Sequence, residues 1–204
     1  MDIEFWIDPI CPWCWVTARW VVDAVQPHRD LNITWQPISL LFKNNPAEDS
    51  PYRKPVEFTH NLLRVLESVR KSEGDAAVQP LYWEYGRRIH HDGDKGFEPA
   101  AALASVGLPV SHAGAFGDEL WDAEIRTRMD AGLALTGNDV GTPIMAFKNA
   151  DGEKVALFSP VITSVPTPEL SLQLWDGFIA VATVPGFWEL KRTRTASPQF
   201  PDRP

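Results

Sequence analysis

Residues 3–14 read IEFWIDPICPWC and decide the fold. The apolar run over residues 3–7 is short, aromatic and stopped by a turn-forming pair, which predicts a buried strand. Cys11 and Cys14 follow at once, and the apolar residues over 13–24 recur with helical spacing. The stretch therefore predicts a strand, a CxxC motif and a helix in direct succession.

A cysteine at the start of a helix faces unpaired backbone N–H groups and the positive end of the helix dipole, and both favour the thiolate. We therefore expect Cys11 to be the exposed nucleophile of a redox dithiol and Cys14, one turn later, to be the buried resolving thiol. Pro12 suits the first helical turn, and Trp13 offers an aromatic surface for a flat substrate. A zinc half-site is the alternative, but it needs further ligands and the chain has no other cysteine.

The second signal is Thr142-Pro143, which precedes an apolar run at 144–147 and, after turn chemistry, another at 155–158. These runs predict a hairpin. In thioredoxin-like folds a cis proline at this place faces the dithiol, and cis bonds are rare and conformationally specific. An ordinary trans proline at a strand edge is the alternative. The CxxC context upstream and the hairpin downstream favour the cis bond.

The order of elements predicts an α/β protein with a thioredoxin-like fold and an inserted α-helical subdomain. Residues 1–39 read strand, helix, strand, and Thr167-Pro168 opens a last helix after the hairpin. The segment between them is helical in pattern. We expect a discontinuous domain of residues 1–45 and 136–204, with residues 46–135 as the insert.

Composition narrows the function. The formal charge is −8, from 19 basic and 27 acidic residues, which argues against nucleic acid as a partner. No apolar run is long enough for a membrane helix, and the start Met1-Asp2-Ile3-Glu4 lacks the positive charge of a secretion signal. We therefore expect a cytoplasmic protein, in which a lone cysteine pair is catalytic rather than a structural staple.

Three smaller signals have competing interpretations. His90-His91-Asp92-Gly93-Asp94 has metal-like letters, but a solvated loop after a helix is the favoured interpretation, with His90 kept as a candidate facing the site. The basic run Lys191-Arg192-Thr193-Arg194 is either a solvated tail or a segment that folds back to bind an anion or a second subunit. Ser39 follows a strand, and no partner base for it is visible in the sequence.

The chain resembles the mycothiol-dependent nitroreductases of actinobacteria, a DsbA-like group. The resemblance rests on five blocks that follow the order of the family: DPICPWCW at 8–15, GRRIH at 86–90, DVGTP at 139–143, LWD at 174–176 and ELKRTRT at 189–195. The last block is the most specific of these, because CxxC and Thr-Pro occur throughout the thioredoxin superfamily.

The resemblance implies a thioredoxin fold with a helical insertion, a homodimer, and a dithiol kept reduced by mycothiol, with no flavin or other bound cofactor and no metal. It implies that electrons pass to disulfides or nitro-aromatic compounds. Carried over by position, Cys11 is the nucleophile, Cys14 is its partner, and Trp13, Asn44 and Tyr52 belong to the substrate pocket. The histidine that helps make exported DsbA proteins strong oxidants is replaced by tryptophan, which argues against a disulfide-forming role.

Three hypotheses stay open at this point. The first is a cytoplasmic thiol–disulfide oxidoreductase that uses mycothiol to reduce nitro-aromatic compounds or disulfides. The second is a DsbA-like protein disulfide oxidoreductase or isomerase, which would need an exposed apolar groove around the motif. The third is a redox-sensing scaffold without turnover, since a fold does not dictate a function. The physiological acceptor and the reduction potential are not readable from the sequence.

Overall fold

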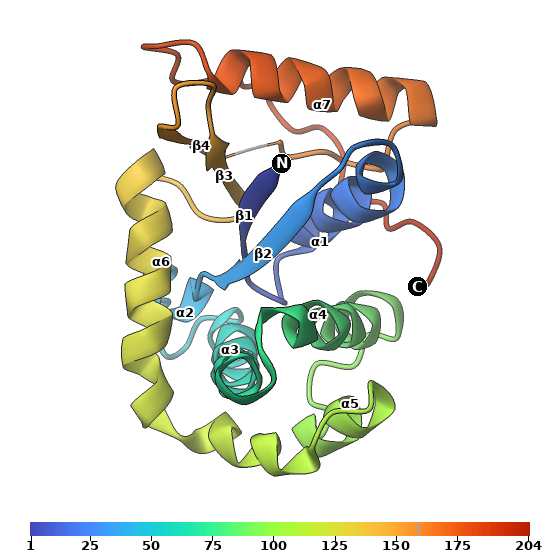
Figure 1. Ribbon diagram of the computed structural model, residues 1–204. Coiled ribbons are helices and arrows are strands. Elements are labelled where there is room, and N and C mark those ends of the chain that lie inside the picture. The colour runs from blue at the N-terminus through green and yellow to red at the C-terminus, as the bar shows by residue number, and fades with distance from the viewer. Residues whose placement is uncertain (159) are drawn as a thin grey trace.

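The centre of the molecule is a four-stranded mixed sheet, seen in a computed structural model that describes residues 1–158 and 160–204 (Figure 1). The strand order is β2-β1-β3-β4, and the strands are β1 (Asp2–Ile7), β2 (Asn32–Pro37), β3 (Ile144–Lys148) and β4 (Lys154–Phe158). β1 runs parallel to β2 and antiparallel to β3, and β3 pairs with β4 in the predicted hairpin. The α/β class expected from the sequence is confirmed.

The predicted helix after the cysteines is confirmed and connects the two parallel strands. It consists of α1 (Pro12–Arg19) and a π-helical continuation (Trp20–Val25), followed by a 3-10 turn (Gln26–His28). Parallel neighbours need such a crossover connection, because a tight turn can only join antiparallel strands. Pro12 occupies the first helical position, where its missing N–H leaves no hydrogen bond unmade.

The chain between β2 and β3 is helical in the structure. Figure 1 places α3, α4 and α5 below the sheet, while α6 runs along its side and leads back to β3. The bounds are α2 (Leu40–Asn44), α3 (Arg53–Glu73), α4 (Val78–Gly86), α5 (Pro99–Ser105) and α6 (Asp122–Thr136), with 3-10 turns at Asp75–Ala77, Val110–Gly117 and Glu119–Trp121 and a π-helical turn at Arg87–His91. The exact limits of a separate insert stay a prediction.

The sheet is covered on both faces because side chains alternate along β1. Phe5 and Ile7 point into the main core, which also holds both cysteines and residues of α1, α3, α4 and α7. Trp6 points the other way, into a smaller cluster with Met129 and Leu133 of α6. This alternation is the period of two that a strand imposes.

An aromatic cluster joins α1 to α4. Trp15 is fully buried and lies edge-to-face with Tyr82 and Trp83, with ring centroids 5.7 and 5.3 Å apart. Its indole passes so close to Gly86 that a Cβ there would lie 2.3 Å from a ring carbon. Glycine at position 86, the last residue of α4, therefore lets α4 approach α1, the helix that begins at the dithiol.

The C-terminal part consists of α7 (Pro168–Ala182) and an extended tail. The predicted start of α7 is confirmed, with Thr167 as the N-cap and Pro168 as the first helical residue, although the Thr167 side chain makes no capping hydrogen bond. Ser111 and Asp118 are residue types that favour helix N-caps. Asp118 caps the 3-10 turn at Glu119–Trp121, which leads into α6, whereas Ser111 lies inside a 3-10 segment.

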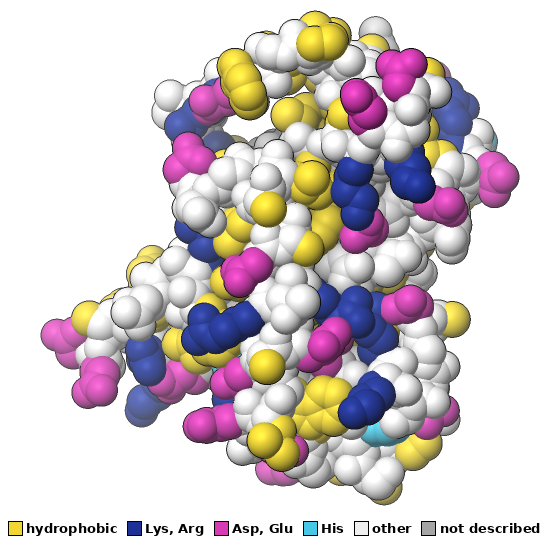
Figure 2. Space-filling view, turned by 60° about the vertical axis from the view of Figure 1, so that its left-hand side comes forward, with side chains coloured by type: hydrophobic (Ala, Val, Ile, Leu, Met, Phe, Trp, Pro, Cys, Tyr) yellow, Lys and Arg dark blue, Asp and Glu magenta, His cyan; other side chains and the backbone are white. Residues whose placement is uncertain are grey.

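The surface carries charges of both signs. On the face shown in Figure 2, acidic and basic side chains are interspersed, so this face has no extended field of one sign. In the described residues, no helix combines the length and the apolar character needed to cross a membrane.

Candidate active site

Cys11 is the N-cap of α1, with an extended backbone at φ −74° and ψ 109°. Its sulfur accepts a hydrogen bond from the backbone N–H of Cys14 at 3.5 Å. The helix thus turns a free amide toward the first sulfur and places the second cysteine one turn away. Both cysteines are free thiols in this structure.

The loop before β3 lies against the two thiols. The Thr142–Pro143 peptide bond is cis, as its position in the sequence predicted. The Cys11 thiol lies 3.7 Å from the Thr142 carbonyl oxygen, to which it donates. The Thr142 hydroxyl donates to the carbonyl of Trp6 at 2.6 Å and lies 3.3 Å from Cys14 Sγ. The structure therefore brings together two signals that are about 130 residues apart in the sequence.

The two thiols differ in exposure. Cys11 is 9% exposed, whereas Cys14 is completely buried and lies 3.8 Å from the hydroxyl of Tyr82 on α4. Tyr82 was not among the residues that the sequence singled out, because nothing local to it signals a partner 68 residues away. The order of exposure is the one expected for an attacking and a resolving thiol.

The expected acidity of Cys11 is not what this conformation has. Burial raises the pKa of the Cys11 thiol to about 11, and the charge of Asp8 acts in the same direction, while the N–H groups of Cys14 and Trp13 and the Arg194 guanidinium lower it. Burial also raises the pKa of Cys14, far above the ordinary value. The helix terminus does favour the thiolate, but desolvation of a sulfur this deeply covered is the larger effect.

Asp8 is a second residue that the sequence analysis did not assign to the site. Its side chain is completely buried and accepts hydrogen bonds from the backbone N–H groups of Ile10 and Leu40 at 3.0 and 2.8 Å. Burial raises its pKa to about 6, although these hydrogen bonds act against the shift. Asp8 therefore ties the loop that precedes Cys11 to the start of α2.

The favoured interpretation of His90 and His91 as part of a solvated loop is wrong. His90 stacks on Trp15 with ring centroids 5.8 Å apart and donates through Nε2 to the carbonyl of Pro9 at 2.9 Å. Burial lowers its pKa to about 4, so the ring is neutral at physiological pH. His91 accepts from the indole N–H of Trp15 at 3.1 Å. Both rings support the helix of the dithiol from behind, and a substrate role for His90 stays a prediction.

Asn44 and Tyr52 are placed away from the contacts just described. Asn44 is the exposed last residue of α2, and Tyr52 is 73% exposed immediately before α3. Among the described residues, no hydrogen bond or aromatic contact joins either side chain to the dithiol. Pro12 and Trp13 do flank Cys11 at the start of α1. A pocket role for all four residues stays a prediction.

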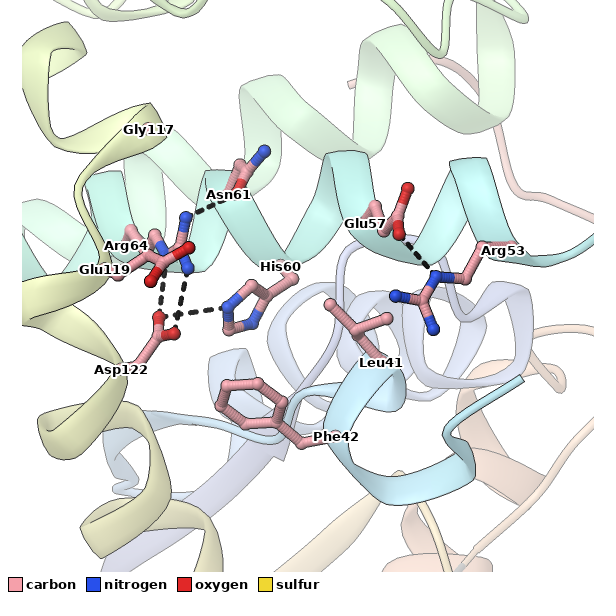
Figure 3. A pocket seen from close by; sticks show the side chains of 10 residues that line it. All are labelled: Leu41, Phe42, Arg53, Glu57, His60, Asn61, Arg64, Gly117, Glu119 and Asp122. Atoms are coloured by element: carbon pink, nitrogen blue, oxygen red, sulfur yellow. Dashed lines mark hydrogen bonds and ion pairs between the residues drawn. The ribbon is translucent and has the colours of Figure 1, made fainter. Parts of the chain in front are cut away.

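A cavity of about 530 Å³ opens between α2, α3 and α6 (Figure 3). In it His60 joins the Ser39 hydroxyl, 3.0 Å from Nδ1, to the Asp122 carboxylate, 3.0 Å from Nε2. The order resembles a hydrolase triad, and His60 is the partner base that the sequence did not reveal for Ser39. However, Ser39 is completely buried and its oxygen caps α2 by accepting from the N–H of Phe42, while Arg64 binds both oxygens of Asp122. The triad is therefore a structural hydrogen-bond chain.

Metal chemistry finds no support in the described residues, because no group of three or more His, Cys, Asp and Glu side chains there could hold an ion.

Comparison with known sequences identifies the family. A sequence model described as mycothiol-dependent nitroreductase Rv2466c matches residues 10–192. The chain belongs to this Rv2466c-like family. The Rv2466c-like chain is also 26% identical over 198 residues to the uncharacterized protein Rv2286c of Mycobacterium tuberculosis, which covers 95% of this chain and 82% of the relative.

Solved structures share the fold. The cytosolic disulfide reductase DsbM of Pseudomonas aeruginosa, solved with GSH, is 15% identical with a TM-score of 0.55 and covers 88% of this chain and 100% of its own. DsbA of the same organism is 19% identical with a TM-score of 0.50 and covers 88% of this chain and 82% of its own. The chain has a DsbA-like thioredoxin fold, and the family that its sequence matches makes it an enzyme of the mycothiol-dependent nitroreductase-like kind.

Proposed function

We propose that the protein is a reductase whose Cys11–Cys14 dithiol is recharged by mycothiol and passes two electrons to a nitro-aromatic compound or a disulfide. The observation that carries the proposal is the geometry of the dithiol. Cys11 is the N-cap of the helix and the more exposed of the two thiols. Cys14 is completely buried, and its backbone N–H donates to the sulfur of Cys11.

With a disulfide acceptor, the Cys11 thiolate attacks one sulfur, forms a mixed disulfide and releases the first thiol of the acceptor. Cys14 then attacks Cys11, releases the second thiol and leaves a Cys11–Cys14 disulfide. With a nitro-aromatic acceptor, the same two electrons and two protons convert the nitro group into a nitroso group and water. One mycothiol opens the protein disulfide by binding Cys11, and a second removes it as mycothiol disulfide.

The electrostatics of the thiols support reduction over disulfide formation. Strong disulfide oxidants owe their oxidising power to a stabilised thiolate in the reduced state. Here burial raises the pKa of both thiols, so the reduced dithiol lacks that stabilisation. A dithiol of this kind gives its electrons away more readily. We accordingly place the enzyme in a reducing compartment, such as the cytoplasm.

Anaerobic turnover of a nitro-aromatic acceptor tests the proposal. Mycothiol, glutathione and thioredoxin are supplied in parallel as reductants, and glutathione is included because a structurally similar reductase was solved with it. We expect turnover with mycothiol, and its loss in Cys11→Ser. Full activity of Cys11→Ser would refute the role of the dithiol, and turnover with thioredoxin alone would refute mycothiol as the reductant. Rapid reduction of insulin without turnover of small acceptors would favour the protein disulfide oxidoreductase instead.

A further inference from the structure

The chain after α7 does not trail into solvent but returns to the helical part of the molecule. Gln199 N–H donates to the carbonyl of Thr163 at 2.7 Å. Phe200 then packs on the rings of His90 and His91, with centroids 5.1 and 5.6 Å away. Figure 1 shows the C-terminus beside α4. We refer to residues 194–204 as the C-terminal strap.

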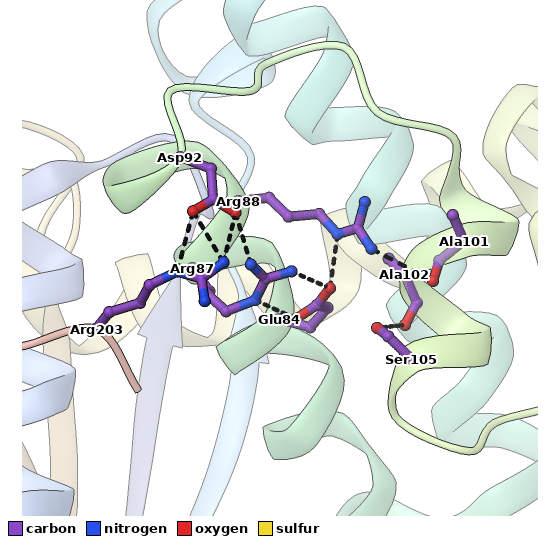
Figure 4. A network of polar contacts seen from close by, with 8 residues as sticks. All are labelled: Glu84, Arg87, Arg88, Asp92, Ala101, Ala102, Ser105 and Arg203. Carbon is purple, nitrogen blue, oxygen red and sulfur yellow. Dashed lines mark hydrogen bonds and ion pairs between the residues drawn. The ribbon is translucent and has the colours of Figure 1, made fainter.

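An ion-pair network fastens the end of the strap (Figure 4). Arg203 binds Asp92 through two hydrogen bonds of 3.0 Å. Asp92 also accepts from Arg87 at 2.6 Å, and Arg87 binds Glu84 of α4 at 2.6 and 2.7 Å. Glu84 is buried, so the network is rooted in the helical part. The strap is therefore held at a defined place.

The first residue of the strap, Arg194, lies beside the CxxC motif. The guanidinium carbon of Arg194 lies 5.1 Å from the ring centroid of Trp13, one of the two residues between the cysteines. The contacts of Gln199, Phe200 and Arg203 form a clasp that begins a few residues further along the chain. This clasp limits how far Arg194 can move from Trp13. Arg194 of the basic run thus lies against Trp13, while binding of an anionic group or a second subunit by this run stays a prediction.

The charges around Cys11 make this position important. Asp8, from the loop before α1, raises the pKa of Cys11, as burial does. The Thr142 carbonyl oxygen also faces the sulfur, and on the inner side Cys14 and Tyr82 are both uncharged at neutral pH. Arg194 is the cation that acts in the opposite direction and lowers the pKa of Cys11.

We propose that Arg194 is a positioning residue of the reaction, held over Trp13 by the strap so that its positive charge stabilises the anionic sulfur of Cys11. The same charge serves twice: when Cys11 attacks the acceptor, and when Cys11 leaves the mixed disulfide as Cys14 attacks it. The inference rests on the proposed function only in taking Cys11 as the attacking thiol.

The test measures the alkylation rate of Cys11 by iodoacetamide across pH, with the modified cysteine identified by mass spectrometry. The variants are Arg194→Gln, Arg194→Lys, and Arg192→Gln as the matched control, because Arg192 lies on the same exposed segment. We expect Arg194→Gln to move the profile to higher pH and to slow alkylation near neutral pH about twofold to fivefold, the range for a charge pair partly screened by water. Arg194→Lys retains most of the rate, and Arg192→Gln changes nothing.

A fourth variant tests the strap itself. Arg203→Gln removes the ion pair with Asp92 at the end of the strap and is expected to move the profile in the same direction as Arg194→Gln, by a smaller amount. Added salt should shrink the difference between wild type and Arg194→Gln. An unmoved profile, or faster alkylation of Arg194→Gln at every pH, would overturn the inference, because the strap would then be only a cover. An equal effect of Arg192→Gln would overturn it as well.

Because the readout is the thiol itself, the two proposals can fail separately. A protein that shows the Arg194-dependent shift but no turnover with mycothiol refutes the proposed function and supports this inference. A protein that turns over with mycothiol at the same rate and pH profile in Arg194→Gln refutes the inference and leaves the function intact.

Discussion

The two thiols lie one helical turn apart, yet they belong to different regions of the molecule. The Cys11 side is slightly exposed, and the charges of Asp8 and Arg194 act on its sulfur in opposite directions. The Cys14 side is completely buried, and the hydroxyls of Tyr82 and Thr142 lie 3.8 and 3.3 Å from its sulfur.

The difference indicates how one helix can carry two chemical roles. At Cys11, the charges of Asp8 and Arg194 move the pKa of the sulfur in opposite directions, and 9% of the residue is exposed. On the buried side, desolvation holds the Cys14 sulfur protonated, while the hydroxyls of Thr142 and Tyr82 act against this by lowering its pKa. Four measurements would break or sharpen this contrast.

The largest effect is expected from exchanging the two cysteines for serine in turn. Cys14→Ser should accumulate a mixed disulfide between Cys11 and a small thiol supplied as its disulfide, since nothing remains to resolve it. Cys11→Ser should form such an adduct at Cys14 about 100-fold more slowly or worse, because Cys14 is completely buried. Intact-mass spectrometry measures both rates. Equal rates would mean that the Cys14 thiol is as accessible as the Cys11 thiol.

The packing of Trp15 against Gly86 predicts a strong effect of Gly86→Ala on stability. The new methyl group would meet the ring of Trp15 at 2.3 Å, and the ring is fully buried, so α1 or α4 must shift. We expect a loss of about 3 kcal/mol in the free energy of unfolding, measured by urea denaturation.

Gly177→Ala is the matched control, since Gly177 is also a helical glycine but has open space around it. There alanine should raise stability by up to about 1 kcal/mol. If both variants behave alike, the contact between Trp15 and Gly86 does not support the site.

Stability should also fall at alkaline pH because of Cys11. Its pKa is raised from about 9 to about 11 on folding, so the folded state holds the thiol proton more tightly than the unfolded state. This contribution is complete below pH 9 and is lost as pH rises to 11. It corresponds to about 2 to 3 kcal/mol. The difference in unfolding free energy between wild type and Cys11→Ser should narrow over this window. A constant difference would show that Cys11 is not desolvated.

The smallest effect is expected from Tyr82→Phe, which removes one of the hydroxyls beside the Cys14 sulfur. That hydroxyl donates to Cys14 Sγ and lowers its pKa, so its loss should slow resolution of the mixed disulfide by about fivefold to tenfold. Tyr85→Phe is the control: the Tyr85 hydroxyl is buried and has no hydrogen-bond partner among the described residues, so its removal should leave the rate unchanged and the stability equal or higher. Stopped-flow quenching of the mixed disulfide compares the two. A similar slowing in both would point to packing instead of the hydrogen bond.

Much of the fold could be read from short stretches of sequence. The run before Cys11, the helical spacing after it and the two apolar segments after Pro143 are local patterns, and each formed the expected element. The cis bond at Pro143 was predictable because its neighbours in sequence identify its place in the fold. Helix starts were predicted less well, since a 3-10 turn can satisfy the same backbone groups that a capping side chain would.

The sequence by itself thus determined where the proposed thiol chemistry is placed, because a CxxC motif between a strand and a helix is a local arrangement. Only the tertiary structure decided how that chemistry is tuned. Tyr82 contacts Cys14 from a helix 68 residues away in the chain, and Arg194 comes to lie over Trp13 only because the strap folds back. Asp8 is close to Cys11 in sequence, but its effect on the thiol depends on how both are buried. Desolvation depends on everything packed around a sulfur, so no pattern along the chain could reveal that it outweighs the helix terminus.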